Sequence, residues 1–117
     1  MILVDTSVWV DHLRAGDARL AALLEGGGVL MHPFVLGEIA CGTLADRGRV
    51  LALLRELPAA VVADPDEVLR YLERHGLHGR GIGYVDLHLL AATALSAAQL
   101  WTRDKRLQAI AVELGLA

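Results

Sequence analysis

The segment Met1-Ile2-Leu3-Val4-Asp5-Thr6-Ser7-Val8-Trp9 opens the chain and indicates its fold class. Its apolar run, residues 2–4, has the length of a short strand buried on both faces. The polar residues that follow, Asp5, Thr6 and Ser7, belong to the types preferred at the N-terminal cap of a helix. We therefore expect a buried strand that leads directly into a helix.

The rest of the chain alternates further short apolar runs with helical patterns. The motif Asp64-Pro65-Asp66-Glu67 is a strong helix start, because an aspartate cap precedes a proline and two acids in the first turn. Besides residues 2–4, we predict strands at residues 29–32, 60–63 and 100–102. We predict helices at residues 18–25, 34–44, 49–57, 65–75, 84–98 and 105–114, the second of them beginning near Pro33. This alternation indicates an α/β fold with a parallel sheet covered by helices on both faces.

The composition favours one globular domain. A chain of 117 residues fits a single hydrophobic core, so we expect one domain over residues 1–117. The apolar fraction of 55% and the mean hydropathy of +0.46 are high for a soluble protein. The chain can therefore bury a substantial core and still present an apolar face to a partner.

Charge and cysteine content limit the function and the cellular compartment. A net charge of -3 excludes a uniformly basic surface for nucleic acid, although bound divalent cations would reverse the sign locally. Cys41 is the only cysteine, which excludes an internal disulfide, and we expect it to be buried. Residues 1–10 lack a basic leader, and the apolar run 84–101 contains polar residues that a membrane span tolerates poorly. A soluble cytoplasmic protein is the expected result.

Four of the fourteen acidic residues have unusual surroundings. Asp5 and Asp104 directly follow predicted strands, at the sheet edge where ligands bind, although each is equally suited to cap the next helix. Glu38 and Asp86 lie among apolar residues on predicted helices, so we expect them to be buried. An unpaired buried carboxylate costs several kcal/mol, and no lysine or arginine is evident as a partner. A divalent metal ion would satisfy all four.

The chemistry of these ligands selects the metal. A set of oxygen ligands suits Mg²⁺, with Mn²⁺ as a substitute. Zinc is disfavoured, because the histidines at 12, 32, 75, 78 and 88 show no spacing typical of ligand pairs.

Four segments together resemble PIN-domain proteins, and more closely the VapC-type toxins of toxin–antitoxin pairs. They are residues 1–9, Gly37-Glu38-Ile39, the run 81–92 (Gly-Ile-Gly-Tyr-Val-Asp-Leu-His-Leu-Leu-Ala-Ala) and the run 100–107 (Leu-Trp-Thr-Arg-Asp-Lys-Arg-Leu). The resemblance implies a three-layer α/β/α sandwich whose central, mainly parallel sheet has four or five short strands. It also implies magnesium-dependent cleavage of RNA, a cognate antitoxin and a homodimer.

The resemblance also assigns roles to individual residues. Asp5, Glu38, Asp86 and Asp104 fall on the four acidic positions of the family, with Asp5 and Asp86 as the principal metal ligands. Thr102 is expected to orient a neighbouring carboxylate. Cations near the glycine-rich loop and the last helix are expected to hold flanking phosphates, namely Arg80, Arg103, Lys105 and Arg106.

Two further features follow from the family comparison. Trp9, with Val8 and Leu13, is a candidate for an antitoxin groove, although packing in the core is the stronger expectation for each of them. The chain ends soon after the last helix, so a final edge strand is expected to be short or absent.

Two other functions remain open at this point. A phosphatase with an aspartyl nucleophile would also place Asp5 after the first strand, but such enzymes usually carry a second aspartate two residues later, where this chain has Ser7. A catalytically inactive binding module of the same shape would use the acids only as structural groups. The sequence does not name the RNA target.

Overall fold

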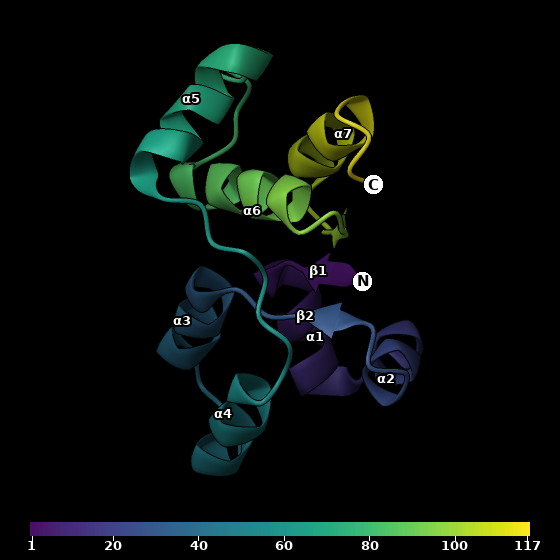
Figure 1. The fold of residues 1–117 in the computed structure, drawn as a ribbon. Coiled ribbons are helices and arrows are strands. Elements are labelled where there is room, and N and C mark those ends of the chain that lie inside the picture. The colour runs from purple at the N-terminus through teal and green to yellow at the C-terminus, as the bar shows by residue number, and fades with distance from the viewer.

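The computed structural model describes residues 1–117 and places a small parallel sheet at the centre of the molecule (Figure 1). Strand β1 (Ile2–Val4) lies between β2 (Val29–Leu30) and β3 (Gln99–Trp101), and both pairings are parallel. Leu3 is opposite Leu30 on one side and Leu100 on the other. The predicted parallel sheet is therefore confirmed, but it has three strands rather than four or five.

The strand predicted at residues 60–63 is wrong. Only a single bridge joins Met31 to Ala59, after which the Val61 N–H donates to Ser96 Oγ at 2.9 Å instead of to a strand. Val61 and Val62 are about half exposed, so their β-branched side chains do not pack into the sheet. At the other edge, no strand follows the last helix.

Seven helices surround the sheet. Their bounds are α1 Thr6–Ala15, α2 Ala18–Glu25, α3 Pro33–Cys41, α4 Arg47–Arg55, α5 Pro65–His75, α6 Tyr84–Leu95 and α7 Lys105–Glu113. Four of them, α2, α3, α5 and α7, begin at a residue whose side chain caps the helix. Helix α2 has the predicted bounds, and α5 begins with a complete capping box between Asp64 and Glu67. Helix α3 stops at Cys41, which is exposed and not buried as expected.

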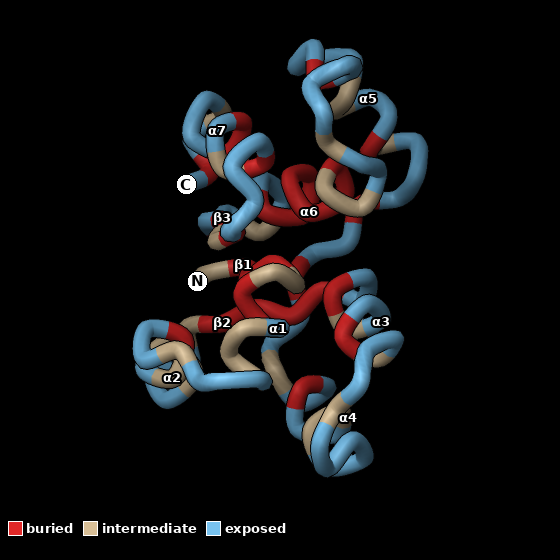
Figure 2. Tube along the Cα trace, turned by 180° about the vertical axis from the view of Figure 1, so that it is seen from behind, coloured by how far each residue is buried: buried red, intermediate tan, exposed pale blue.

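The helices divide into two groups around β1. In Figure 1, α5, α6 and α7 lie on the β3 side of the molecule, and α1 to α4 lie on the β2 side. Buried residues gather around the sheet and along α6, whereas α4 and the ends of the outer helices are exposed (Figure 2). In α6 every residue from Leu87 to Thr93 is buried, which confirms the prediction of a helix packed on nearly all sides. No helix is both long and apolar enough to cross a membrane.

The sheet topology brings distant parts of the sequence to one edge. Asp5 follows β1, and Thr102 follows β3, which is the neighbouring parallel strand. The chain leaving β2 passes through His32 into α3. Carboxyl ends of parallel strands lie at the same edge of a sheet, which is where such folds bind ligands.

Candidate active site

Asp5 occupies the N-cap position of α1, but its carboxylate does not cap that helix. Its Oδ2 instead accepts hydrogen bonds from Ser7 Oγ at 2.8 Å and from Thr102 Oγ1 at 2.7 Å. Only 7% of Asp5 is exposed. Both hydroxyl groups bind the same carboxylate oxygen. The other oxygen of Asp5, Oδ1, has no donor in the protein.

The turn after β3 is joined to the start of α1 by the same hydroxyls. Thr102 Oγ1 accepts from the Asp104 N–H at 3.1 Å, and Ser7 Oγ accepts from the Arg103 N–H at 3.0 Å. Each hydroxyl therefore bridges backbone of the β3–α7 turn to the Asp5 carboxylate. This network fixes Asp5 relative to Asp104.

Glu38 is exposed, contrary to the expectation that it would be buried. Helix α3 buries only Val35 and Ile39, so its apolar sequence does not correspond to a helix enclosed on all sides. Oε1 of Glu38 accepts from Thr6 Oγ1 at 2.7 Å, which ties α3 to the first turn of α1. Solvent therefore reduces the desolvation cost predicted for Glu38.

Asp86 lies in the first turn of α6 and is partly buried. Its Oδ2 accepts from the Gly83 N–H at 3.1 Å. Burial raises the pKa of Asp86, the negative charges of Asp5, Asp104 and Glu38 raise it further, and the Gly83 hydrogen bond opposes the shift. Asp86 therefore lies within electrostatic reach of the other three acids.

Asp104 caps α7, as one of its two predicted roles required. Its Oδ1 accepts from the backbone N–H groups of Arg106 at 2.9 Å and Leu107 at 3.0 Å. The side chain is exposed, and Oδ2 has no hydrogen-bond partner in the protein. Capping therefore occupies only half of this carboxylate.

The four carboxylates share one arrangement: a protein donor holds one oxygen, and the other oxygen is free. The anchored atoms are Asp5 Oδ2, Glu38 Oε1, Asp86 Oδ2 and Asp104 Oδ1. None of the four acids forms an ion pair, since the salt bridges of the molecule involve other carboxylates. The site therefore combines oriented acceptors with uncompensated negative charge.

Carboxylate oxygens are the type of ligand that a hard divalent cation prefers. In the structure, however, the four carboxylates do not surround a common point. No three acidic, histidine or cysteine side chains stand together as a complete set of metal ligands. Mg²⁺ keeps several waters and commonly binds through only one or two carboxylates, with substrate phosphates supplying further oxygens. A loose group of half-free carboxylates agrees with that mode.

The predicted substrate-binding cations fall into two classes. Arg80 pairs with Glu113 at 2.9 Å, and Arg103 bridges Asp11 at 2.8 Å and Asp17 at 2.7 Å. Lys105 and Arg106 are exposed and form no ion pair. Only this second class has its charge free for a phosphate.

Two buried histidines lie behind the site, and the sequence analysis gave them no role. His32 is fully buried; its Nδ1 caps α3 by accepting the Phe34 N–H at 3.0 Å, and its Nε2 has no partner. Burial, with a smaller effect of His88, lowers the pKa of His32 to about 4. The His88 ring lies 6.4 Å away on α6, and burial lowers its pKa too. The position of His32 just before Pro33 was the signal for this cap.

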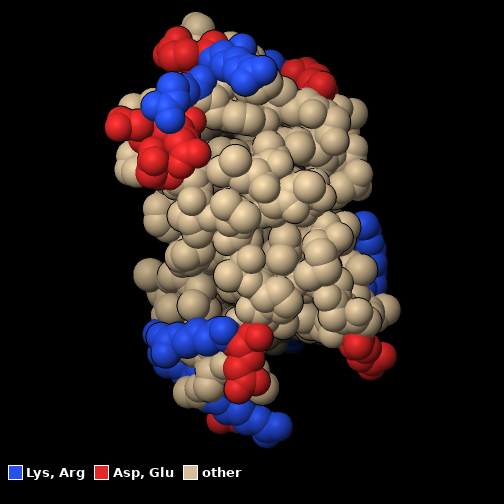
Figure 3. Space-filling model, viewed as in Figure 1, with Lys and Arg blue, Asp and Glu red and all other residues tan.

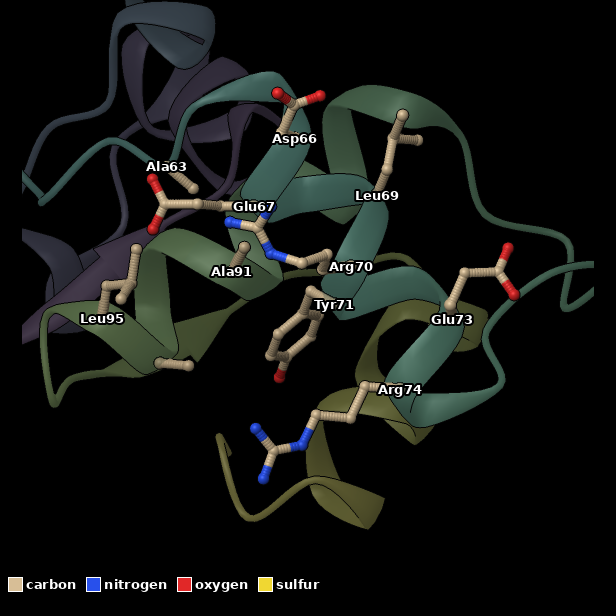
Figure 4. A pocket seen from close by; sticks show the side chains of 11 residues that line it. Ala63, Asp66, Glu67, Leu69, Arg70, Tyr71, Glu73, Arg74, Ala91 and Leu95 are labelled. Atoms are coloured by element: carbon tan, nitrogen blue, oxygen red, sulfur yellow. The ribbon is translucent and has the colours of Figure 1, made fainter.

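A large hollow in the surface does not contain the four acids of the site. It has a volume of about 820 Å³ and lies between α5 and the second half of α6 (Figure 4). Its lining combines apolar residues, among them Leu69, Ala91 and Leu95, with the charged residues Asp66, Glu67, Arg70, Glu73 and Arg74. The face in Figure 3 is largely free of charged residues between its two ends.

The proposed antitoxin contacts near the N-terminus belong mainly to the core. Val8 and Trp9 are buried, and Leu13 is partly buried and packs against the core. The stronger of the two expectations is therefore correct for Val8 and Trp9.

Comparison with known proteins identifies the family of the chain. The PIN domain family matches residues 2–113, a range that includes all four acids. Ribonuclease VapC32 of Mycobacterium tuberculosis (strain ATCC 25618 / H37Rv) is 52% identical over 118 residues, covering 100% of this chain and 95% of the relative. The protein of the same name from strain CDC 1551 / Oshkosh gives the same values. The chain therefore belongs to the PIN-domain family.

Proposed function

We propose that this protein is a magnesium-dependent endoribonuclease, the toxin of a type II toxin–antitoxin pair, which hydrolyses RNA phosphodiester bonds. One observation carries the proposal: four carboxylates lie near one edge of the sheet, each with one anchored and one free oxygen, and none has a basic partner. The name of the 52% identical relative, a ribonuclease, supports the same activity.

The carboxylates have distinct tasks in this proposal. Asp5 and Asp86 are the principal ligands for Mg²⁺ or Mn²⁺, and Glu38 and Asp104 complete the site directly or through water. Bound Mg²⁺ supplies a polarised water and stabilises charge on the phosphate and the leaving oxygen. Thr102 holds Asp5 in a fixed orientation, so its free oxygen needs little reorganisation to bind.

Cations near the site would hold the RNA. Lys105 and Arg106 have unpaired charges and are the first candidates for phosphate contacts. Arg80 and Arg103 would have to exchange their carboxylate partners for phosphate, so we place them second. Phosphate contacts fix the register of the RNA and leave the choice of bases to other residues.

The activity is tested by incubating the purified protein with RNA in Mg²⁺ and in EDTA, and by replacing Asp5→Asn and Asp86→Asn. We expect cleavage by the wild type in Mg²⁺ and at least a hundredfold loss in the other three cases, because the nucleophile and the phosphate charge both depend on the ion. Asp66→Asn, which removes an exposed acid from α5, is the matched control and should cleave normally. Equal activity in all samples would reject the nuclease function.

Metal binding is measured separately from catalysis. A ligand that binds only the folded state raises its stability by mass action, so millimolar Mn²⁺ should raise the melting temperature of the wild type. Asp86→Asn should reduce this increase. The same substitution removes repulsion from the other three acids, so it should stabilise the protein in EDTA.

We further propose that the protein acts in the cytoplasm, forms a homodimer and binds a cognate antitoxin. The hollow between α5 and α6 and the exposed Leu69 and Leu95 support the homodimer, because exposed apolar patches of this kind mark interaction surfaces. We also propose that the sheet and its helices form the three-layer α/β/α sandwich of the PIN-domain family.

A further inference from the structure

The glycine-rich loop before α6 is held against α7 by two arginine side chains. Arg80, within this loop, pairs with Glu113 near the end of α7 at 2.9 Å. Arg106, in the first turn of α7, lies across Gly81: a Cβ added there would meet Nη1 at 2.8 Å and Cδ at 2.9 Å. The loop position is therefore set by α7.

Arg106 differs from its neighbours in having no acidic partner. Both Arg80 and Arg103 form ion pairs, whereas the Arg106 guanidinium forms neither an ion pair nor a side-chain hydrogen bond. Its side chain is exposed and rests on a backbone that carries no Cβ. The guanidinium has no acidic partner, so its charge is available to a ligand.

The guanidinium also lies between two segments that carry the acids. Gly81 is two residues before Gly83, whose N–H holds Asp86, and Arg106 is two residues after Asp104 and donates its own N–H to that carboxylate at 2.9 Å. RNA that approaches four carboxylates is repelled through every phosphate. A cation at this border offsets that repulsion for the nearest phosphate.

We propose that Arg106 binds a backbone phosphate of the RNA beside the acidic site, and that Gly81 positions the Arg106 side chain for this contact. The inference rests on the proposed ribonuclease function; it selects Arg106 from the two candidate cations and adds Gly81 as the residue that positions it. A guanidinium presents a planar set of donors that matches two phosphate oxygens, which gives the contact direction as well as charge. Gly81 acts through Arg106 and is a positioning residue.

The loop supplies its own control for Gly81. Gly79 has φ +70° and Gly81 has φ +81°, so an alanine is similarly strained at either position. Nothing lies within 4 Å of a Cβ added at Gly79, whereas the same atom at Gly81 would displace Arg106. The two alanine variants therefore differ mainly in the Arg106 contact.

The test uses a fluorescein-labelled pool of single-stranded oligoribonucleotides of mixed sequence. Fluorescence anisotropy in EDTA measures binding of the pool, and incubation in Mg²⁺ measures its cleavage. Arg106→Gln should raise the Kd and the KM by about three- to tenfold, leave kcat nearly unchanged and lower the slope of log K against log salt by about one. Gly81→Ala should change the Kd, the KM and the salt slope in the same directions as Arg106→Gln, but by a smaller amount. Gly79→Ala should behave as wild type, and Gly81→Ala should add nothing in an Arg106→Gln background.

Wild-type Kd and salt slope in Arg106→Gln would overturn the proposal. Equal RNA binding by Gly81→Ala and Gly79→Ala, with comparable melting temperatures, would overturn the role of Gly81. Failure of the wild type to cleave in Mg²⁺ would contradict the proposed function instead, and the anisotropy measurements in EDTA would still test Arg106 alone.

Discussion

At the scale of single residues, hydroxyl groups orient the carboxylates of the acidic site. Ser7 and Thr102 both donate to Asp5, and Thr6 donates to Glu38. Hydrogen bonds to charged groups contribute about 1.5–3 kcal/mol, more than bonds between neutral groups. These side chains therefore hold one oxygen of an acid in place while the other remains open.

Thr102→Val tests this role, because valine keeps the shape but removes the hydroxyl between Asp5 and the Asp104 N–H. We expect a loss of about 1–3 kcal/mol in the free energy of unfolding and a ten- to hundredfold loss in Mn²⁺ affinity or cleavage rate. Urea unfolding and calorimetric Mn²⁺ titration measure the two effects. Thr93→Val is the control: its buried hydroxyl donates to Leu89 O at 2.6 Å, away from the acids, so it should lose stability and keep Mn²⁺ affinity. Equal Mn²⁺ affinities in the two variants would contradict the assigned role.

At the scale of elements, the starts of the helices place the acids. Gly83, the N-cap residue of α6, donates its N–H to Asp86, and Asp104 is itself the N-cap residue of α7. Helix α3, which carries Glu38, is capped by a neutral imidazole, since His32 Nδ1 must be unprotonated to accept the Phe34 N–H. The α3 cap should therefore be lost when His32 is protonated.

Stability should fall as the pH is lowered through the range between the unfolded and folded pKa values of His32. Its pKa is about 4 in the folded protein against 6.5 for an unperturbed histidine, so the unfolded chain binds more protons between these limits. This contribution is fully present above pH 6.5 and is lost toward pH 4, by about 2 kcal/mol between pH 7 and pH 5. Urea unfolding at both pH values measures it. His32→Asn retains a capping acceptor and cannot titrate, so a pH dependence as steep as that of the wild type would contradict the prediction.

At the scale of the whole molecule, the acidic site and the hollow between α5 and α6 lie on different parts of the surface. Charged side chains gather toward the two ends of the face in Figure 3, and those of α5 border the hollow. The four acids of the site lie elsewhere, where strands end and α6 and α7 begin. One molecule can therefore bind a partner and RNA through different surfaces.

Leu95→Glu, on the wall of the hollow, should convert the proposed homodimer into a monomer, because it would bury an unpaired charge at the interface. Light scattering coupled to gel filtration gives the mass of each species. Val112→Glu, an exposed position on α7 that lines no part of the hollow, is the control and should remain dimeric. A monomeric wild type at micromolar concentration would contradict the proposal.

Much of the secondary structure was predictable because local signals and tertiary packing agree. The capping box at Asp64 and the apolar run of α6 both act within one element, and both predictions are confirmed. Predictions failed where only the neighbours of a segment decide. Val61 and Val62 have the sequence of a strand but meet no strand, and Glu38 has apolar neighbours but lies on an exposed face.

The sequence by itself determined the α/β class, the positions of the helices and the four acids to consider, because apolar periodicity and capping are local properties of a chain. Only the tertiary structure decided that the sheet has three strands, that Glu38 is exposed and that Arg80 and Arg103 are paired while Arg106 is not. These properties depend on which distant groups meet, and parallel pairing brings together residues nearly a hundred positions apart, such as Asp5 and Thr102. Local sequence patterns do not predict which residues far apart in the chain come into contact.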